Sequence, residues 1–322
     1  MREFPRPKIW NMAPKLNIAI ILIAAQTLIA QTVESSNLNN RPVIGILALD
    51  TDSTYGKTMI PITYVKFLEQ AGARVVPIKG GQPEDYYQQM VNYTNGILIT
   101  GGAVSFETSL IGRSARIVYK LALALNDKGD YYPMWGTCMG FQLLCYLTEG
   151  VNLLKPTDSN NASWPLKFST DVKGSRMFKN APPELMEILS TEPVTQNQHS
   201  YSILIPDFEK SLLSKFFTKL STNKDRKGVE FISSVEGKKY PIYGVQWHPE
   251  KNNFNWNPNY EINHDADAVR VGQYMANFFV NEARKSQHKF PSLEAEAKSL
   301  IQNYKRVYFS DGTFFENYYI DA

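Results

Sequence analysis

The sequence predicts an α/β fold in which a largely parallel β-sheet is covered by helices on both faces. Between residues 43 and 149, short apolar runs alternate with segments of helical periodicity. The short runs are apolar throughout rather than at every second position, which is typical of strands buried on both faces. A chain of 322 residues, 43% of them hydrophobic, is long enough to bury such a core in one sizeable domain.

The elements of this fold are expected in an alternating order. Strands are predicted at 43–49, 74–78, 96–100 and 132–136, and helices at 60–71, 84–92, 114–126 and from about 139 onward. This succession is a doubly wound βα series.

The second half of the chain is less regular. From 151 to 234, Pro, Asn, Ser and Thr interrupt the apolar runs, and hairpins and loops added to the sheet are expected there. Strands are predicted at 230–235 and 242–247, followed by a helix over 266–284. The tail after Pro291 is aromatic, and we expect it to pack back on the domain because so many exposed rings would be a liability.

The N-terminus has the pattern of a secretory signal peptide. Basic residues precede an apolar run at 18–29, which is short for a membrane span and ends at Ala30, a small residue suited to cleavage. We therefore predict a signal peptide over 1–30 and a folded domain over 41–322, in an exported protein with no membrane span after cleavage. An uncleaved anchor or a buried helix is the alternative for this run, and Met12 is an alternative start.

Charge and cysteine usage limit the partners and cross-links. The 34 basic and 31 acidic residues are spread along the chain and leave a formal charge of +3, so a nucleic-acid partner is not expected. Sequons at Asn92 and Asn161 are candidate glycosylation sites, in keeping with export. Cys138 and Cys145 fall on one predicted helix with their backbones about 10 Å apart, which excludes a disulfide between them.

The strongest chemical signal is the segment Gly136-Thr137-Cys138-Met139-Gly140, where an apolar strand turns into a helix. This is a nucleophile elbow with cysteine in the place of serine, and the two glycines allow the sharp turn. The helix N-terminus favours the Cys138 thiolate. The alternative is a buried structural cysteine beside two packing glycines.

Two backbone amides are candidates for an oxyanion hole. The Met139 amide follows the cysteine and points in the same direction. A second donor should come from a glycine turn at a neighbouring strand end, and Gly102, in the turn after the strand at 96–100, is that candidate.

The candidate base is His248, in the segment GVQWHPE. Another strand ends there, and Glu250 stands two residues further on, where it can orient the imidazole. Together with Cys138 these residues form a Cys-His-Glu triad, whereas a surface histidine beside a solvated glutamate is the alternative. His264 and His288 are expected on the surface, and the four scattered histidines predict no metal site.

These motifs carry a resemblance to a known family. GTCMGFQLL and GVQWHPEK resemble the class I glutamine-amidotransferase superfamily, and WGTCMGF, VQWHPEK, YPIYG and ANFFVNEARK resemble the γ-glutamyl hydrolases, peptidases of C26 type, over about 41–284. The resemblance implies a flavodoxin-like three-layer αβα sandwich whose catalytic domain covers 41–322. It also implies hydrolysis of folyl-poly-γ-glutamates and antifolate polyglutamates, in lysosomes or vacuoles or after secretion.

The resemblance also assigns roles to residues. It places the nucleophile on Cys138, the proton-transferring histidine on His248 and a second functional histidine on His199, expected to position substrate. Gln142 is a departure, because members of the family often carry glutamate four residues after the nucleophile. The implied reaction proceeds through a thioester and needs no cofactor.

Two other functions compete with this interpretation. A glutamine amidotransferase subunit that supplies ammonia to a synthase would use the same triad, and a non-enzymatic binding protein could share the scaffold. An amidotransferase would release ammonia from glutamine, whereas a γ-glutamyl hydrolase would release glutamate from a γ-linked peptide. Thiol labelling of Cys138 distinguishes an enzyme from a binding protein. The sequence leaves the oligomeric state open, with a homodimer among the options.

Overall fold

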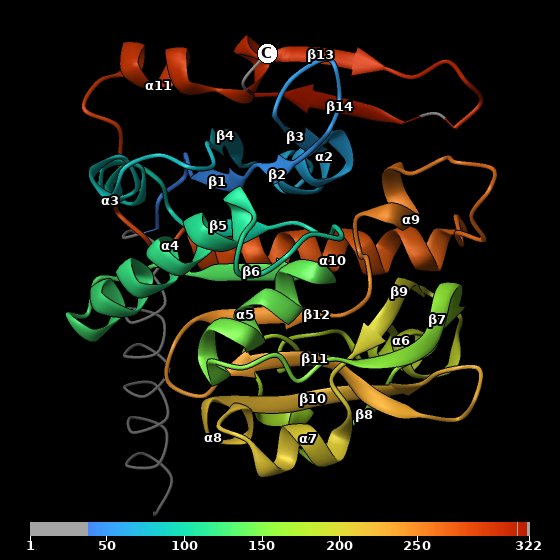
Figure 1. Cartoon of the computed structure of the whole chain (residues 1–322). Coiled ribbons are helices and arrows are strands. Elements are labelled where there is room, and N and C mark those ends of the chain that lie inside the picture. Colours follow the sequence, from blue (N-terminus) through green and yellow to red (C-terminus); the bar gives the residue numbers. More distant parts are fainter. Residues whose placement is uncertain (1–37, 314, 321–322) are drawn as a thin grey trace, which may run out of the picture. The chain divides into compact units, whose positions relative to one another are not determined.

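The computed structural model describes residues 38–313 and 315–320, so the signal peptide predicted over 1–30 lies outside the described residues. The folded unit is built on an eight-stranded sheet (Figure 1). Its strands run in the order β4 (Arg74–Ile78), β1 (Val43–Leu47), β5 (Ile97–Ile99), β6 (Met134–Thr137), β12 (Ile242–Val245), β11 (Glu230–Gly237), β10 (Phe217–Lys224) and β8 (Lys167–Phe168). The first five strands are parallel and the others are antiparallel.

Helices cover both faces of this sheet. One face carries α2 (Ile62–Glu69) and α10 (Ala266–Ala283), and the other carries α3 (Glu84–Tyr93), α4 (Leu110–Asp127) and α5 (Met139–Glu149). Successive residues of a strand point to opposite faces, so Ile44 and Ile46 join one hydrophobic cluster while Val43 and Leu47 join the other. The parallel strands follow the flavodoxin-like order 2-1-3-4-5. The predicted three-layer α/β sandwich is therefore confirmed.

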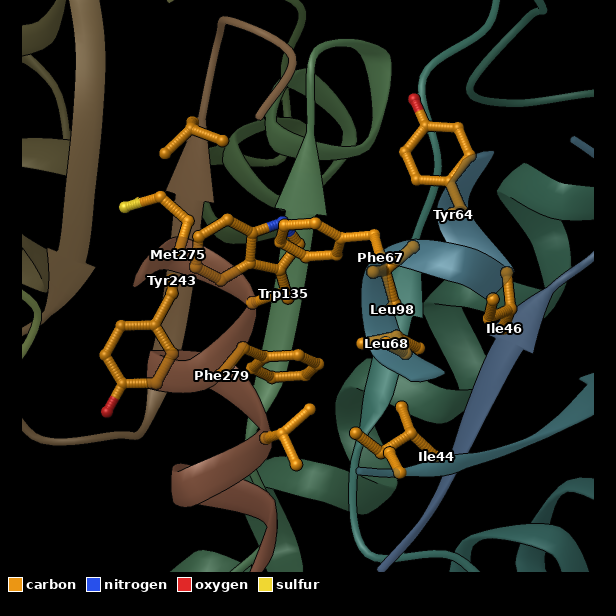
Figure 2. Close-up of a cluster of buried hydrophobic side chains, with 14 of the residues drawn as sticks. Ile44, Ile46, Tyr64, Phe67, Leu68, Leu98, Trp135, Tyr243, Met275 and Phe279 are labelled. Atoms are coloured by element: carbon orange, nitrogen blue, oxygen red, sulfur yellow. The ribbon is translucent and has the colours of Figure 1, made fainter. Parts of the chain in front are cut away.

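The first cluster is held together by aromatic rings from three elements (Figure 2). Trp135 of β6 packs against Phe67 of α2 and Phe279 of α10, with ring centroids 6.2 and 5.5 Å apart. Each such buried ring stabilises the fold by about 1.5–3 kcal/mol. Tyr64 lies at the rim of the cluster, with its hydroxyl directed away from the other labelled side chains.

The irregular segment contains more helix than its sequence predicts. One hairpin is present, because β10 pairs with the next strand, β11; β7 (Lys155–Trp164) pairs with β9 (Thr195–Ser202) across the intervening β8 and α6. The segment also holds η1 (Thr170–Gly174), α6 (Pro183–Thr191), α7 (Ile205–Lys210) and α8 (Leu213–Phe216), none of which was predicted. These helices are short, so too few turns are available for helical periodicity to register.

The tail packs back on the domain, as expected. It forms α11 (Leu293–Ser299), η2 (Ile301–Asn303) and the hairpin of β13 (Lys305–Tyr308) and β14 (Glu316–Tyr319). β14 pairs with β3 (Thr58–Pro61), which pairs with β2 (Leu49–Asp50). Tyr318 and Tyr319 are buried, but the expectation is wrong for Tyr308 and Phe315, which are 53% and 37% exposed.

Several predicted boundaries are also wrong, among them the start of α2, the start of α4 and the end of β12. Ile60 and Pro61 belong to β3 rather than to the following helix, because the Pro61 backbone is extended, with ψ 134°. The helix predicted from residue 114 begins at Leu110, where the Ser109 side chain accepts a hydrogen bond from the Gly112 amide and caps the helix. The strand predicted to residue 247 ends at Val245. No helix of the described residues is long and apolar enough to cross a membrane.

Candidate active site

Cys138 stands at a strained turn between β6 and α5. Its backbone has φ 53° and ψ −110°, a conformation that residues with a Cβ rarely adopt. The turn is held by the Cys138 amide, which donates a hydrogen bond to the Val245 carbonyl of β12 at 2.8 Å. Such strain persists only where the surroundings enforce it, and it is typical of functional sites. The predicted elbow geometry is therefore present.

The two glycines of the elbow are required by close packing. A Cβ on Gly140 would lie 2.1 Å from the Ile99 carbonyl oxygen of β5, and a Cβ on Gly136 would lie 2.6 Å from the Gly140 backbone. Both distances are far below van der Waals contact, so any side chain would push α5 away from the sheet. The glycines thus bring the N-terminus of α5 against the end of β5.

His248 and Glu250 lie on the loop that follows the neighbouring strand, β12. The His248 Nδ1 atom is 2.7 Å from Glu250 Oε1, and both side chains are buried. A carboxylate only accepts hydrogen bonds, so Nδ1 carries the proton and Nε2 is left as the basic nitrogen. Among the described residues, Nε2 has no hydrogen-bond partner.

The imidazole and the thiol are electrostatically coupled. Burial by itself lowers the pKa of His248, but the Glu250 carboxylate and the nearby Cys138 thiolate outweigh it, and the net pKa is raised. A Cβ built on Gly101 would lie 2.8 Å from His248 Cε1 and 3.3 Å from Cys138 Cβ. The His248 and Cys138 side chains therefore both lie against Gly101. The structure therefore brings the three residues of the predicted triad together.

Tyr64 of α2 is a member of this cluster that sequence analysis missed. Its hydroxyl accepts a hydrogen bond from the Gly101 amide at 2.8 Å and lies 3.4 Å from His248 Nδ1. Burial raises its pKa well above the ordinary value, and the charges of Glu250 and Cys138 raise it further, so the hydroxyl stays protonated. In the sequence this residue has only the helical spacing of a core position.

The two candidate oxyanion donors lie near Cys138: Met139 follows it in the chain, and Gly102 lines the same cavities as Cys138. Gly102 follows β5, and a Cβ there would be 3.2 Å from the Met139 side chain. Since the Gly101 amide is occupied by Tyr64, Gly102 is the next available donor of this turn. Neither the Gly102 amide nor the Met139 amide donates a hydrogen bond within the part of the chain that the structure describes. Two free donors near a thiol are what an oxyanion hole requires.

His199 lies on β9 and is buried. Its Nε2 atom donates to Asn197 Oδ1 at 3.0 Å, and its Nδ1 atom accepts from Ser202 Oγ at 3.1 Å. Burial, and then the charge of His248, lower the pKa of His199 to about 3. The ring is neutral at ordinary pH, and both of its nitrogens have partners. The burial of His199 is tolerated because its polar atoms are hydrogen-bonded.

Gln142 lies one turn beyond Cys138 on α5. Its side-chain amide donates to the Tyr201 carbonyl at 2.8 Å and to Gln246 Oε1 at 3.1 Å. These bonds connect α5 to the end of β9 and to the strand that leads to His248. A neutral amide at this position adds no negative charge near the Cys138 thiolate.

Two cavities meet at Cys138. One, of about 890 Å³, lies between β3, α2, the loop after β12 and the tail, and we call it the base-side cavity because His248 lines it. The other, of about 710 Å³, is lined by Met139, Gln142 and His199 and by the loop after β5, and we call it the oxyanion-side cavity. Both are lined by Gly102, Cys138 and Gln198. Substrate groups can therefore approach the sulfur from two directions.

The remaining predicted residues lie elsewhere. Cys145 is a buried free thiol, in agreement with the excluded disulfide. His288 is not on the surface as expected: its side chain is 11% exposed and pairs with Asp130, because α10 leads it back against the end of α3. Asn92 is exposed and Asn161 is half-buried. No group of residues in the described part of the chain could hold a metal ion.

A thiol at the end of a buried strand, beside a histidine–carboxylate pair, is the arrangement of a cysteine hydrolase.

The peptidase C26 family model matches residues 42–250. The chain is 44% identical to the γ-glutamyl hydrolase of Homo sapiens, over 87% of this chain and 89% of the human one. It is 41% identical to γ-glutamyl hydrolase B of Dictyostelium discoideum, with 88% and 84% covered. A solved glutamine amidotransferase of Thermotoga maritima aligns with a TM-score of 0.43 at 11% identity, over 76% of this chain and 99% of that one. The chain belongs to the peptidase C26 family and is a hydrolase.

Proposed function

We propose that this protein is a γ-glutamyl hydrolase that cleaves the γ-linked glutamates of folyl-poly-γ-glutamates. One observation of the site carries the proposal: Cys138 is held in a strained elbow beside the buried His248–Glu250 pair. The relatives named γ-glutamyl hydrolase, at 40–44% identity in mammals, support the choice of bond. An ammonia-supplying amidotransferase, which would use the same three residues, has less support.

The reaction uses groups already in place. The Cys138 sulfur attacks the γ-carbonyl carbon, and the amides of Gly102 and Met139 stabilise the oxyanion. His248, held by Glu250, takes the thiol proton of Cys138 on Nε2 and gives it to the leaving nitrogen as the C–N bond breaks and a thioester remains. His248 then takes a proton from water, which attacks the thioester and frees the carboxylate and the thiol. His199 has a positioning role and transfers no proton, because both of its ring nitrogens are hydrogen-bonded to Asn197 and Ser202.

The test is product analysis on purified protein. Wild type should release glutamate or short γ-glutamyl peptides from folyl-poly-γ-glutamate, leave α-linked glutamate intact and release no ammonia from glutamine. Cys138→Ala should lose more than about a hundredfold in turnover with an unchanged melting temperature, whereas the matched variant Cys145→Ala should keep its activity. Equal rates on α- and γ-links, or a Cys138→Ala enzyme with a tenth of its activity, would contradict the proposal.

We further propose that the protein enters the secretory route and works in the lysosome, the vacuole or outside the cell. The N-terminal pattern and the two sequons support this route. Sequencing the N-terminus of the mature protein and treating it with a glycosidase test it. As a separate point, we propose that the protein is a homodimer, which sedimentation of the mature protein would test.

A further inference from the structure

The reacting bond of a substrate must lie where the two cavities meet, because the Cys138 sulfur is there. The residues Gly102, Ala103, Cys138 and Gln198 line both cavities. Cys138 is the nucleophile and Gly102 a donor to the oxyanion, whereas Ala103 has no polar side-chain atom. Among the described residues at this meeting point, Gln198 is therefore the one with a polar side chain that the proposed mechanism does not use.

The strand that carries Gln198 holds it close to the reacting groups. Gln198 lies on β9, and its backbone carbonyl oxygen accepts a hydrogen bond from Cys138 Sγ at 3.8 Å. The carbonyl of Gln196, on the same strand, accepts a hydrogen bond from the His248 amide at 2.8 Å. β9 is thus bonded to both the nucleophile and the base, so the position of Gln198 relative to both is fixed.

The side-chain oxygen of Gln198 lacks a partner. Oε1 is shielded from solvent, and no donor in the described ranges bonds to it. Its neighbours on β9 differ, because the side chains of Asn197 and His199 are bonded to each other and to further groups. A buried acceptor without a donor costs free energy, and such an atom at a cavity wall is suited to a donor that a ligand brings.

A scissile γ-amide offers one donor that the proposed mechanism leaves unpaired. Its carbonyl oxygen faces the oxyanion donors, and its nitrogen lone pair must face His248 Nε2. The N–H of the same nitrogen needs an acceptor once the bond has left water. An acceptor also fixes the nitrogen in one orientation, so that the lone pair is directed at the histidine as the carbonyl carbon becomes tetrahedral.

We propose, on the basis of the proposed function, that Gln198 Oε1 accepts a hydrogen bond from the N–H of the scissile γ-amide and so orients the nitrogen toward His248. Gln198 is then a positioning residue that favours amide bonds. It transfers no proton: the N–H stays on the nitrogen, and the second proton comes from His248, which took it from the Cys138 thiol. A neutral carboxamide suits this place, because a carboxylate there would disfavour the thiolate.

The experiment compares two substrates that differ at one atom. One is pteroylglutamyl-γ-glutamate, and the other has an ester oxygen in place of the scissile N–H. Gln198→Met keeps the length of the side chain but removes the acceptor. It should lower kcat/KM about tenfold for the amide, mainly through kcat, and less than about twofold for the ester, which has no N–H to leave unpaired.

Two further variants complete the comparison. Gln198→Glu keeps an oxygen at the same distance from the backbone, so the ratio of amide to ester kcat/KM should stay within about twofold of the wild-type ratio. Both rates should fall in that variant, because the added charge disfavours the thiolate. The control Gln88→Met makes the same change on the exposed side of α3, and both rates should stay near those of wild type.

The outcomes separate this inference from the proposed function. If wild type cleaves neither compound, the proposed function fails. If wild type cleaves the amide but Gln198→Met lowers both substrates equally, or neither, the assignment of Gln198 is wrong. Circular dichroism of each variant excludes misfolding, and Gln198→Leu supplies a second test should Gln198→Met not fold.

Discussion

At the scale of single residues, the active-site cluster is defined by which polar atoms have partners. His248 Nδ1 is bound to Glu250 and its Nε2 is free within the described residues. The Gly101 amide is bound to Tyr64, which leaves the Gly102 amide available. The atoms that the reaction needs therefore have no hydrogen-bond partner within the described residues, whereas the polar atoms next to them are hydrogen-bonded.

Glu250→Gln should change the pH dependence of the reaction. The Glu250 carboxylate raises the pKa of His248, so the imidazolium that faces the thiolate persists to higher pH than an ordinary histidine would allow. Without that carboxylate, His248 should lose its proton at lower pH, and the alkaline limb of kcat/KM should move down in pH. Glu294→Gln, on exposed α11, is the control, and an alkaline limb that does not move in Glu250→Gln would contradict this role.

Tyr64→Phe should separate positioning from chemistry. The hydroxyl holds the Gly101 amide and touches His248, but it reaches no reacting atom in the proposed mechanism. Its loss should lower kcat about five- to tenfold with little change in KM, because the Gly102 turn and the imidazole lose a common support. Steady-state kinetics measure the split. A variant with wild-type kcat would show that the turn holds its shape without this hydroxyl.

At the scale of elements, the site depends on how closely α5 approaches β5. The carbonyl of Ile99 lies where a Cβ of Gly140 would be, so the helix N-terminus and the strand end are in backbone contact. This contact determines where Cys138 stands relative to the glycine turn that follows β5. Packing of one helix on one strand therefore sets the distance between nucleophile and oxyanion donor.

Gly140→Ala should disturb both stability and activity. The added methyl group must displace α5, which costs about 1–3 kcal/mol of unfolding free energy and moves Cys138 away from its partners. Gly174→Ala is the matched control, because a Cβ there meets nothing within 4 Å and its stability should change by less than about 1 kcal/mol. Urea unfolding and kcat measure the two effects. Equal unfolding midpoints for the two variants would contradict the packing argument.

At the scale of the whole domain, the tail completes a structure that begins near residue 43. β14 pairs with β3, and β3 leads directly into α2, which carries Tyr64. Tyr318 and Ile320 belong to the hydrophobic cluster on the α2 face. Residues of the tail also line the base-side cavity, including the exposed rings of Tyr308 and Phe315. The C-terminal segment thus supports the same wall of the site as the N-terminal strands.

A chain that ends after Asn303 should be markedly less stable. It loses three buried side chains, those of Tyr318, Tyr319 and Ile320, each worth about 1.5–3 kcal/mol. It also removes β14, one of the two strands that pair with β3, and leaves β2 as the other. The urea midpoint of the truncated protein should fall well below that of wild type, whereas Tyr308→Ala should barely change it, since that ring is 53% exposed. A truncated protein with a wild-type midpoint would show that the tail is not part of the core.

The sequence by itself determined the alternation of strands and helices, the elbow at Cys138 and the pair His248 and Glu250. These signals are local: continuous apolar runs, two glycines around a cysteine, and a carboxylate two residues from a histidine. The tertiary structure decided what depends on segments far apart in the chain. It brought Tyr64 of α2 to the Gly101 turn and buried His199 behind polar partners. It also brought residues of the tail to the base-side cavity, which Tyr308 and Glu316 line. Such contacts cannot be predicted from one sequence, because the spacing of residues along the chain does not determine which side chains pack together after folding.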